Sequence, residues 1–460
     1  MKLVIVESPA KATTIGKFLG GNYKVKASFG HVRDLPKSAS EIPASIKSKP
    51  WARLGVDVDG DFSAVYVVQK ESRKNIAELK ELCKNADEVI LATDEDREGE
   101  SISWHLLEVL KPKTPVKRIA FHEITRSAIN EAMQHPRTVN EQLVRAQETR
   151  RILDRLFGYE LSPVLWRKVR GKLSAGRVQS VALRLVVERE EERRAFNKSS
   201  YYDAEASLSK DGKTFKATLT TADGKRIATG KDFDPATGNL KPDEANRVVW
   251  LQENEANTLT GKMLKAIPWK VVRVEQKETR VRPYPPFITS TLQQVAGGAL
   301  NFSPRKTMQV AQKLYEGVNL GNGSREGLIT YMRTDSVTLS EKALQNAQVF
   351  IRAQYGEQYH QRRQYTTKSK MAQEAHEAIR PTQMGRPPED IAAFLTRDEL
   401  RLYELIWKRA VASQMADGIV LRTAVDIESA DENHRAELRA TGSVVVFPGF
   451  MRVSNDKQKD

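Results

Sequence analysis

One stretch of the sequence organises the others: GLITYMRTDS, residues 327–336. Residues 328–333 are predicted to form a short strand, because β-branched and aromatic residues lie between a glycine and a polar turn. Residues two apart on a strand share a face, so Tyr331 and Arg333 would point the same way. A guanidinium beside a phenol favours the phenolate and can bind a phosphate oxygen. Tyr331 is therefore a candidate nucleophile, with a packed strand tyrosine as the alternative interpretation.

The composition indicates a basic, multidomain chain. Its 460 residues suit roughly two to four domains, and 74 basic against 59 acidic residues give a net charge of +15. That balance favours an acidic partner, with nucleic acid the first candidate. No run of about 18 apolar residues predicts a membrane span. The single cysteine, Cys83, excludes an internal disulfide or a cysteine-rich zinc site, and a reducing cytoplasm is expected.

Residues 1–140 are predicted to form an α/β domain with a parallel sheet. An apolar strand at 2–6 leads to Glu7 and a helix, and a second predicted strand, DEVILAT at 87–93, leads to the acidic loop DEDREGE at 94–100. The carboxyl ends of neighbouring parallel strands meet at one sheet edge, so Glu7, Asp94 and Asp96 are expected to gather there. Carboxylate oxygens with room for water suit Mg²⁺. A solvated acidic turn is the alternative.

Residues 141–196 are predicted to be helical and basic. Residues 165–187 contain six basic residues and no acidic one. The segment SAGRVQS at 174–180 combines small residues, which let a backbone approach a ligand closely, with the donors Arg177 and Gln179. This pattern favours a nucleic-acid contact over the commoner solvated basic face.

The remaining chain alternates between strands and helices. Antiparallel strands are expected at 201–208, 214–221 and 271–278, and the proline-rich segment 283–286 predicts a domain boundary. Amphipathic helices are expected at 289–300 and 306–316, before the Tyr331 segment. Strands at 421–428 and 437–446 are expected to return to the sheet of residues 197–282.

Three of these motifs resemble the type IA DNA topoisomerases, in the bacterial topoisomerase I branch: residues 327–336, VIVESPAKA at 4–12 and TDEDREGE at 93–100. The resemblance implies a multidomain fold of α/β, α and β parts. These are a parallel-sheet α/β Toprim domain (1–140), an incomplete helical DNA-groove domain (141–196), an incomplete antiparallel β-rich arch domain (197–286 and 415–460) and a helical, winged-helix-like domain with the active tyrosine (287–414). Family members continue past this point, so the chain is expected to be C-terminally shortened.

The resemblance also implies roles for single residues. Tyr331 would attack a DNA phosphate, with charge stabilised by Arg333 and His376. Glu7 or Lys11 would protonate the leaving oxygen. Mg²⁺ would be held by Asp94, Asp96, Glu98 and Glu7. DNA would be contacted by Arg118, Arg151, Asp154, Ser174, Gly176, Arg177, Gln179 and Arg380.

The activity that the resemblance implies is that of a DNA topoisomerase I, an isomerase. It would relax negatively supercoiled DNA without ATP, through single-strand cleavage with a 5′-phosphotyrosyl intermediate, strand passage and religation. Its partner would be single-stranded segments of the supercoiled duplex, and it would act as a monomer in the bacterial nucleoid. Two alternatives stay open: a Toprim-type metal nuclease or primase that does not need Tyr331, and a truncated, non-catalytic DNA-binding fragment.

Overall fold

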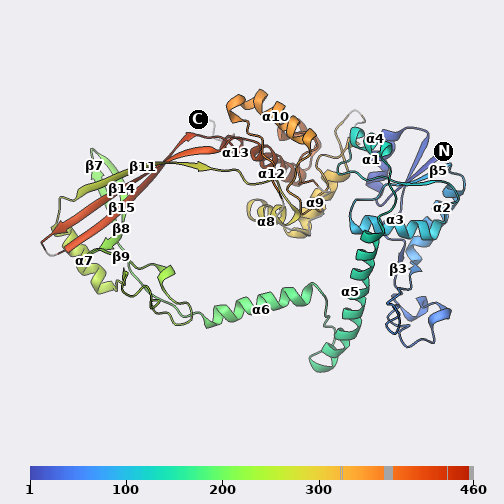
Figure 1. The fold of residues 1–460 in the computed structure, drawn as a ribbon, viewed down its shortest axis with the longest axis horizontal. Helices are drawn as coiled ribbons and strands as arrows, with labels where there is room; N and C mark the ends of the chain where they lie inside the picture. Colours follow the sequence, from blue (N-terminus) through green and yellow to red (C-terminus); the bar gives the residue numbers. More distant parts are fainter. Residues whose placement is uncertain (322, 324, 367–376, 433, 455–460) are drawn as a thin grey trace. The chain divides into compact units, whose positions relative to one another are not determined.

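The computed structural model describes residues 1–321, 323, 325–366, 377–432 and 434–454. The chain forms two compact units, whose elements are labelled in Figure 1. The first unit comprises residues 1–177 and 283–416 together with a C-terminal segment from Val453. The second unit comprises residues 178–282 and 417–452.

The N-terminal part of the first unit is built on a parallel sheet. Its strands lie in the order β2 (Tyr23–Ala27), β1 (Lys2–Val6), β5 (Glu88–Leu91) and β6 (Val116–Arg118). Helices α1 (Pro9–Leu19), α2 (Arg73–Lys84), α3 (Arg97–Leu110) and α4 (Arg126–Gln134) accompany it, with a short ladder of β3 (Arg33–Asp34) and β4 (Val67–Val68). Leu3, Ile5, Val89 and Leu91 are fully buried, as expected for strands covered on both faces. The predicted parallel-sheet α/β domain is confirmed.

A long helix follows this sheet. Helix α5 (Glu141–Lys168) begins at Asn140, whose side-chain oxygen accepts hydrogen bonds from the backbone N–H groups of Gln142 and Leu143. Such a cap satisfies donors that the first helical turn leaves without partners. The helix packs against α3, which brings its basic residues beside the acidic loop.

The rest of the first unit is mainly helical. It contains α8 (Thr289–Leu300), α9 (Pro304–Glu316), α10 (Glu341–Tyr355), α11 (Pro388–Ile391) and α12 (Arg397–Ser413), with the β12 (Val318–Asn319) and β13 (Arg325–Glu326) hairpin. Helix α12 begins with a reciprocal capping box between Thr396 and Glu399. Its Leu402 and Ile406 are fully buried.

The predicted strand at 328–333 is wrong. This segment forms an isolated bridge between Ile329 and Pro381 and is otherwise irregular. The reason is that its backbone groups bond to several different segments instead of one neighbouring strand. The N–H of Leu328 donates to the carbonyl of Leu314 at 2.7 Å, and that of Tyr331 donates to the carbonyl of His122 at 2.7 Å.

The second unit is a sheet with helices. The sheet runs β10 (Val248–Val249), β9 (Lys225–Ile227), β8 (Lys213–Ala222), β15 (His434–Phe447), β14 (Gly418–Asp431) and β11 (Lys270–Val281), and β7 (Glu205–Lys210) pairs with β8. In this sheet the described strand pairs are antiparallel except for the parallel pair β9 and β10. Helix α7 (Glu253–Lys265) contributes Leu259 and Met263 to its core, while α6 (Gln179–Ala195) has no buried residue. The late strands β14 and β15 pair with strands from before residue 283, and the short helix α13 (Met451–Ser454) follows them.

Candidate active site

Two carboxylates and an ammonium group meet at the carboxyl edge of the parallel sheet. Because β1 and β5 are neighbours, Glu7 and Asp94, which follow them, arrive at the same edge. Lys11, on the first turns of α1, is fully buried, and its Nζ forms ion pairs with both carboxylates. The ammonium group therefore holds together two acidic groups that would otherwise repel each other.

The two carboxyl groups differ in their affinity for a proton. Burial and the nearby charge of Asp94 raise the pKa of Glu7 to about 8, against the opposing effect of Lys11. Burial also acts to raise the pKa of Asp94, but the ammonium of Lys11 outweighs it and that pKa is lowered. Glu7 thus keeps a proton near neutral pH while Asp94 is charged. Oε2 of Glu7 is buried and accepts no hydrogen bond from the residues that the structure describes.

Asp96 joins the acidic loop to helix α3. Its Oδ1 accepts the backbone N–H of Gly99 at 2.8 Å and so caps the helix. A Cβ at Gly99 would lie 2.0 Å from the carbonyl oxygen of Asp94, so only glycine fits this turn. The close approach fixes Asp94 and Asp96 relative to each other.

Tyr331 reaches this loop from far along the chain. Its hydroxyl donates a hydrogen bond of 2.7 Å to Oδ2 of Asp96, and its side chain is almost fully buried. Burial, followed by the charges of Asp94 and Asp96, raises the pKa of Tyr331, and these effects outweigh Arg333. Arg333 favours the phenolate, as the sequence indicated, but burial and the two carboxylates outweigh it. Tyr331 is a phenol whose proton already points at a carboxylate.

A second tyrosine, Tyr315, supports the first. It is fully buried, its hydroxyl donates to Oδ1 of Asp94 at 3.0 Å, and its ring centroid lies 5.2 Å from that of Tyr331. The Nζ of Lys11 lies 4.8 Å from the same ring. Sequence reasoning missed Tyr315, because a tyrosine on the apolar face of α9 has the pattern of a core residue.

A cavity of about 970 Å³ opens beside these groups. It is lined by the acidic residues Glu7, Asp94, Asp96 and Glu98 and by the basic residues Arg305, Lys306, Lys313 and Arg333. Arg333 and Tyr331 both line it, although they do not lie on a strand. Burial acts to lower the pKa of Arg333, but Tyr331 and the carboxylates raise it above its usual value. The cationic groups suit a phosphate bound in this cavity.

The four predicted metal ligands are not assembled as one cage. Within the described residues, no three His, Cys, Asp or Glu side chains are grouped so as to hold a metal ion. Oε2 of Glu98 instead contacts Nε2 of His31 at 2.9 Å, and this contact lowers the pKa of Glu98. Mg²⁺ is commonly bound through one or two carboxylates with water and substrate phosphate, and Toprim domains generally bind Mg²⁺. Asp94 and Asp96, both lining the cavity, fit that smaller ligand set.

Several predicted DNA-contacting residues surround a hollow of about 620 Å³ along α5. Arg151, Asp154 and Ser174 line it, together with Tyr159 and Trp166. Two bidentate pairs order the region: Arg151 binds Asp34 at 2.7 and 2.9 Å, and Arg177 binds Asp154 at 2.9 and 3.1 Å. Gly176 lies next to Arg177 in the same segment, whereas Gln179 is the first residue of α6 and belongs to the second unit.

Two residues predicted to contact DNA are buried in this structure. Arg118 is 1% exposed, donates to Oε1 of the buried Glu100 at 3.0 Å and to the carbonyl of Asp94 at 2.7 Å. Arg380 is 6% exposed and forms ion pairs with Glu123 and Glu377. Both guanidinium groups hold protein segments together and do not face solvent. The remaining predicted site residue, His376, lies outside the described residues.

The sequence comparisons agree with this geometry. The chain matches the Toprim domain over residues 2–124 and the DNA topoisomerase family over residues 138–460. DNA topoisomerase 1 of Synechocystis sp. is 54% identical over 98% of this chain and 49% of its own length, and that of Mycolicibacterium smegmatis is 52% identical over 98% and 48%. The chain therefore spans about half the length of these curated relatives. Among its described helices, none is long and apolar enough to cross a membrane.

A solved structure shows the same fold. Full-length topoisomerase I from Thermotoga maritima superposes with a TM-score of 0.76 and 36% identity, covering 100% of this chain and 68% of that protein. The matched families extend over most of the sequence, and the acidic edge and Tyr331 both lie within them. The chain belongs to the bacterial DNA topoisomerase I family of type IA enzymes.

Proposed function

We propose that this chain cleaves one DNA strand with Tyr331 as the nucleophile, as the cleavage step of a DNA topoisomerase I reaction. The observation that carries the proposal is the 2.7 Å hydrogen bond from the Tyr331 hydroxyl to Asp96 at the wall of the cavity. In this geometry Asp96 accepts the phenolic proton when Tyr331 attacks. A base is needed because the raised pKa of Tyr331 keeps the phenol protonated until then.

The proposed step balances without an external energy source. The phenolic oxygen of Tyr331 bonds to phosphorus and its proton moves to Asp96. The bond from phosphorus to the 3′ oxygen breaks, and that oxygen takes a proton from Glu7. One phosphodiester bond is replaced by one 5′-phosphotyrosyl bond, so the reverse reaction can reseal the strand without ATP.

The choice of Glu7 over Lys11 as the general acid follows from their protonation. A carboxyl group with a pKa of about 8 both holds a proton at neutral pH and releases it readily. Burial acts to lower the pKa of Lys11, but its interactions with Asp94, and then with Glu7, outweigh burial and raise that pKa, and its ammonium group contacts both carboxyl groups. We assign Lys11 to holding these groups in place. Arg333 stabilises charge on the phosphate.

Mg²⁺ would be held by Asp94 and Asp96. When bound, the ion would neutralise phosphate charge and position the cleaved ends. The chain's own residues carry the covalent chemistry.

The DNA substrate is proposed to be single-stranded. The hollow along α5 combines the aromatic rings of Tyr159 and Trp166 with Arg151, and stacking beside cationic groups suits unpaired bases. Relaxation of negatively supercoiled DNA by a monomer in the bacterial nucleoid is the function proposed for the enzyme that contains these units.

The experiment uses 3′-end-labelled single-stranded DNA, because a 5′-phosphotyrosyl link keeps the 3′ part of the cleaved strand on the protein. Wild-type chain and a Tyr331→Phe variant are each incubated with the DNA and Mg²⁺, then denatured and separated by electrophoresis. The proposal predicts labelled protein for the wild type and none for the variant. DNA cleavage by both proteins would support a Toprim-type nuclease, and DNA binding without any adduct from the wild type would support a non-catalytic fragment.

A further inference from the structure

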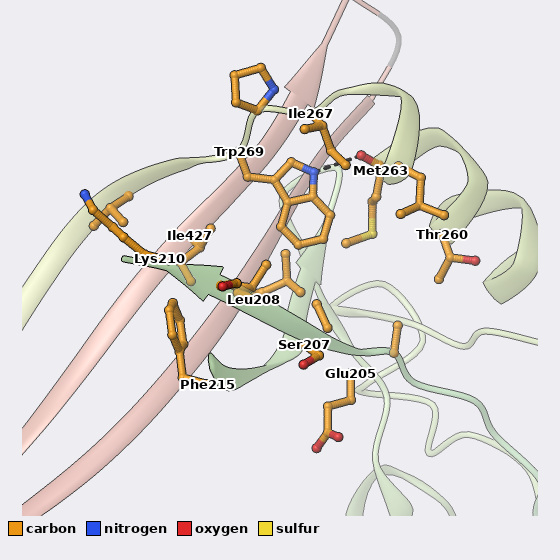
Figure 2. A pocket seen from close by; sticks show the side chains of 17 residues that line it. Glu205, Ser207, Leu208, Lys210, Phe215, Thr260, Met263, Ile267, Trp269 and Ile427 are labelled. Carbon is orange, nitrogen blue, oxygen red and sulfur yellow. Dashed lines mark hydrogen bonds between the residues drawn. The ribbon is translucent and has the colours of Figure 1, made fainter. Parts of the chain in front are cut away.

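An apolar pocket in the second unit lies far in sequence from the catalytic tyrosine and has no part in the proposed chemistry. It has a volume of about 600 Å³, within the ~300–1,000 Å³ typical of ligand sites. Its floor is formed by Met263, Ile427 and Leu438, which belong to the core of this unit. Figure 2 shows Trp269, Ile267 and Met263 on one side of β7 and Phe215 of β8 on the other.

The pocket runs along the edge of a strand. All residues from Ala204 to Lys210 line it, so both inward- and outward-facing positions of β7 contribute. Side chains of a strand alternate between faces, and a pocket on one face would be lined by every second residue. The pocket therefore touches the backbone of β7 as well as its side chains, and β7 has an open edge here because it pairs with β8 alone among the described strands.

That edge carries backbone groups without a neighbouring strand. Strand β7 pairs with β8 alone within the described part of the chain. The N–H of Leu219 donates to the carbonyl of Ala204 at 2.8 Å, so these two residues form a hydrogen-bonded pair. In an antiparallel ladder such pairs alternate, so the N–H and C=O groups of Glu205, Ser207 and Ser209 point away from β8. The described residues give these groups no hydrogen-bond partner.

The two charged residues at the ends of β7 differ in whether they form an ion pair. Glu205 at one end of β7 forms an ion pair of 2.6 Å with Lys216. Lys210 at the other end has no ion-pair partner among the described residues. Leu264 and Ile267 at the apolar rim are 64% and 62% exposed. An occupant should thus offer backbone hydrogen bonds, a large apolar side chain and an acidic group near Lys210.

We propose that this groove binds an extended peptide segment of a partner protein, which adds to β7 as an antiparallel strand. Its N–H and C=O groups pair with Glu205, Ser207 and Ser209, and a leucine or phenylalanine side chain enters between Leu208, Met263 and Trp269. An acidic residue at its N-terminal end lies beside Lys210, which ends β7. The indole N–H of Trp269 donates to the carbonyl of Met263 at 2.8 Å. This hydrogen bond holds the Trp269 side of the groove in place in the protein without peptide. Addition of a strand to an open sheet edge is a general mode of peptide recognition.

The test uses the full chain and a defined probe, the acetylated peptide Glu-Leu-Thr-Leu-Thr-Leu-Thr with a C-terminal fluorescein. Saturable binding by fluorescence anisotropy is expected. A peptide N-methylated at its threonines keeps the side chains but loses the donors that face β7, and it should bind at least tenfold more weakly. This control needs no change in the protein, so it does not depend on the folding of a variant.

A matched pair of variants tests the protein edge. Ser207→Pro removes an outward N–H at a position where an edge strand tolerates proline, and it should weaken binding at least tenfold. Ser209→Ala keeps its backbone groups and should bind within twofold of wild type. Absence of saturable binding, equal binding of the N-methylated peptide, or full binding by a Ser207→Pro protein with a wild-type circular dichroism spectrum would each overturn the proposal.

Discussion

The hydroxyl of Tyr331 and Oδ2 of Asp96 lie 2.7 Å apart although 235 positions separate the two residues in the sequence. One belongs to an irregular segment after α9 and the other caps α3. Their contact joins the tyrosine-bearing part of the first unit to its parallel sheet. The contact also connects the proposed nucleophile, Tyr331, to the acidic loop through a hydrogen bond.

Replacement of Tyr315 by Phe should slow cleavage without abolishing it. The change keeps the ring beside Tyr331 and Lys11 but removes the hydrogen bond to Asp94. Hydrogen bonds to charged groups contribute ~1.5–3 kcal/mol, so adduct formation should slow about tenfold or more with unchanged DNA binding. Single-turnover kinetics provide the measurement, with Tyr331→Phe as the inactive control. A wild-type rate would show that the Tyr315 hydroxyl does not position Asp94 for reaction.

The rate of adduct formation should fall as pH rises through about 8. The pKa of Glu7 lies above its ordinary value because of burial and Asp94, so the acid form needed to protonate the leaving oxygen is present below about pH 8 and is lost above it. Glu7→Gln cannot supply the proton and should be slower by ~10²–10⁴ at pH 7. The rate of adduct formation by Glu7→Gln should also no longer fall as pH rises through about 8. An identical decline in Glu7→Gln would assign it to another group.

The same shift in the pKa of Glu7 affects folding. Between about pH 4.5 and 8 the folded protein binds a proton that the unfolded chain releases. The contribution of Glu7 to stability is therefore complete below about pH 4.5 and decreases as pH rises to about 8. Urea midpoints measured at several pH values should show a smaller decrease for Glu7→Gln than for wild type.

Lys11→Met should destabilise the first unit strongly. The variant leaves Glu7 and Asp94 buried without their cation, and removal of one partner from a buried ion pair costs ~3–5 kcal/mol. Lys24→Met provides the matched control, because Lys24 is exposed on β2 and should change stability by less than about 0.5 kcal/mol. Urea unfolding followed by circular dichroism compares them. Equal, small effects would contradict a structural role for Lys11.

Arg118 and Arg177 should behave differently in DNA binding. Arg118→Met should lower stability, since it breaks the buried contact with Glu100, and leave the salt dependence of DNA binding unchanged. Arg177→Met should reduce the slope of log K against log salt by ~0.7, the value for one phosphate contact on single-stranded DNA. Anisotropy titrations at several salt concentrations distinguish them. A reduced slope for Arg118→Met would restore it as a DNA contact.

Local patterns predicted much of the fold. The apolar run at 2–6 was sufficient to predict β1 and the helix α1 that follows Glu7, and the helix at 289–300 has the predicted bounds. The convergence of Glu7 and Asp94 followed from the geometry of parallel strands. These features depend on periodicity and capping, which are local properties of the sequence.

The errors concern contacts between distant segments. The Tyr331 segment has the composition of a strand, but its backbone bonds to α9 and to the segment containing His122 instead of to a strand neighbour. The turn of Glu98 toward His31 and the burial of Arg118 against Glu100 depend on how α3 packs with β3, α5 and β6. Charge alone could not distinguish these structural pairs from ligand-binding groups.

The most direct test of the central claim identifies the protein atom that carries the DNA. The covalent complex formed with 5′- or 3′-labelled oligonucleotide is digested with protease, and the nucleotide-bearing peptide is sequenced by mass spectrometry. The account predicts a nucleotide attached through its 5′ phosphate to Tyr331. Attachment to Tyr315 or any other residue, or attachment through a 3′ phosphate, would contradict it.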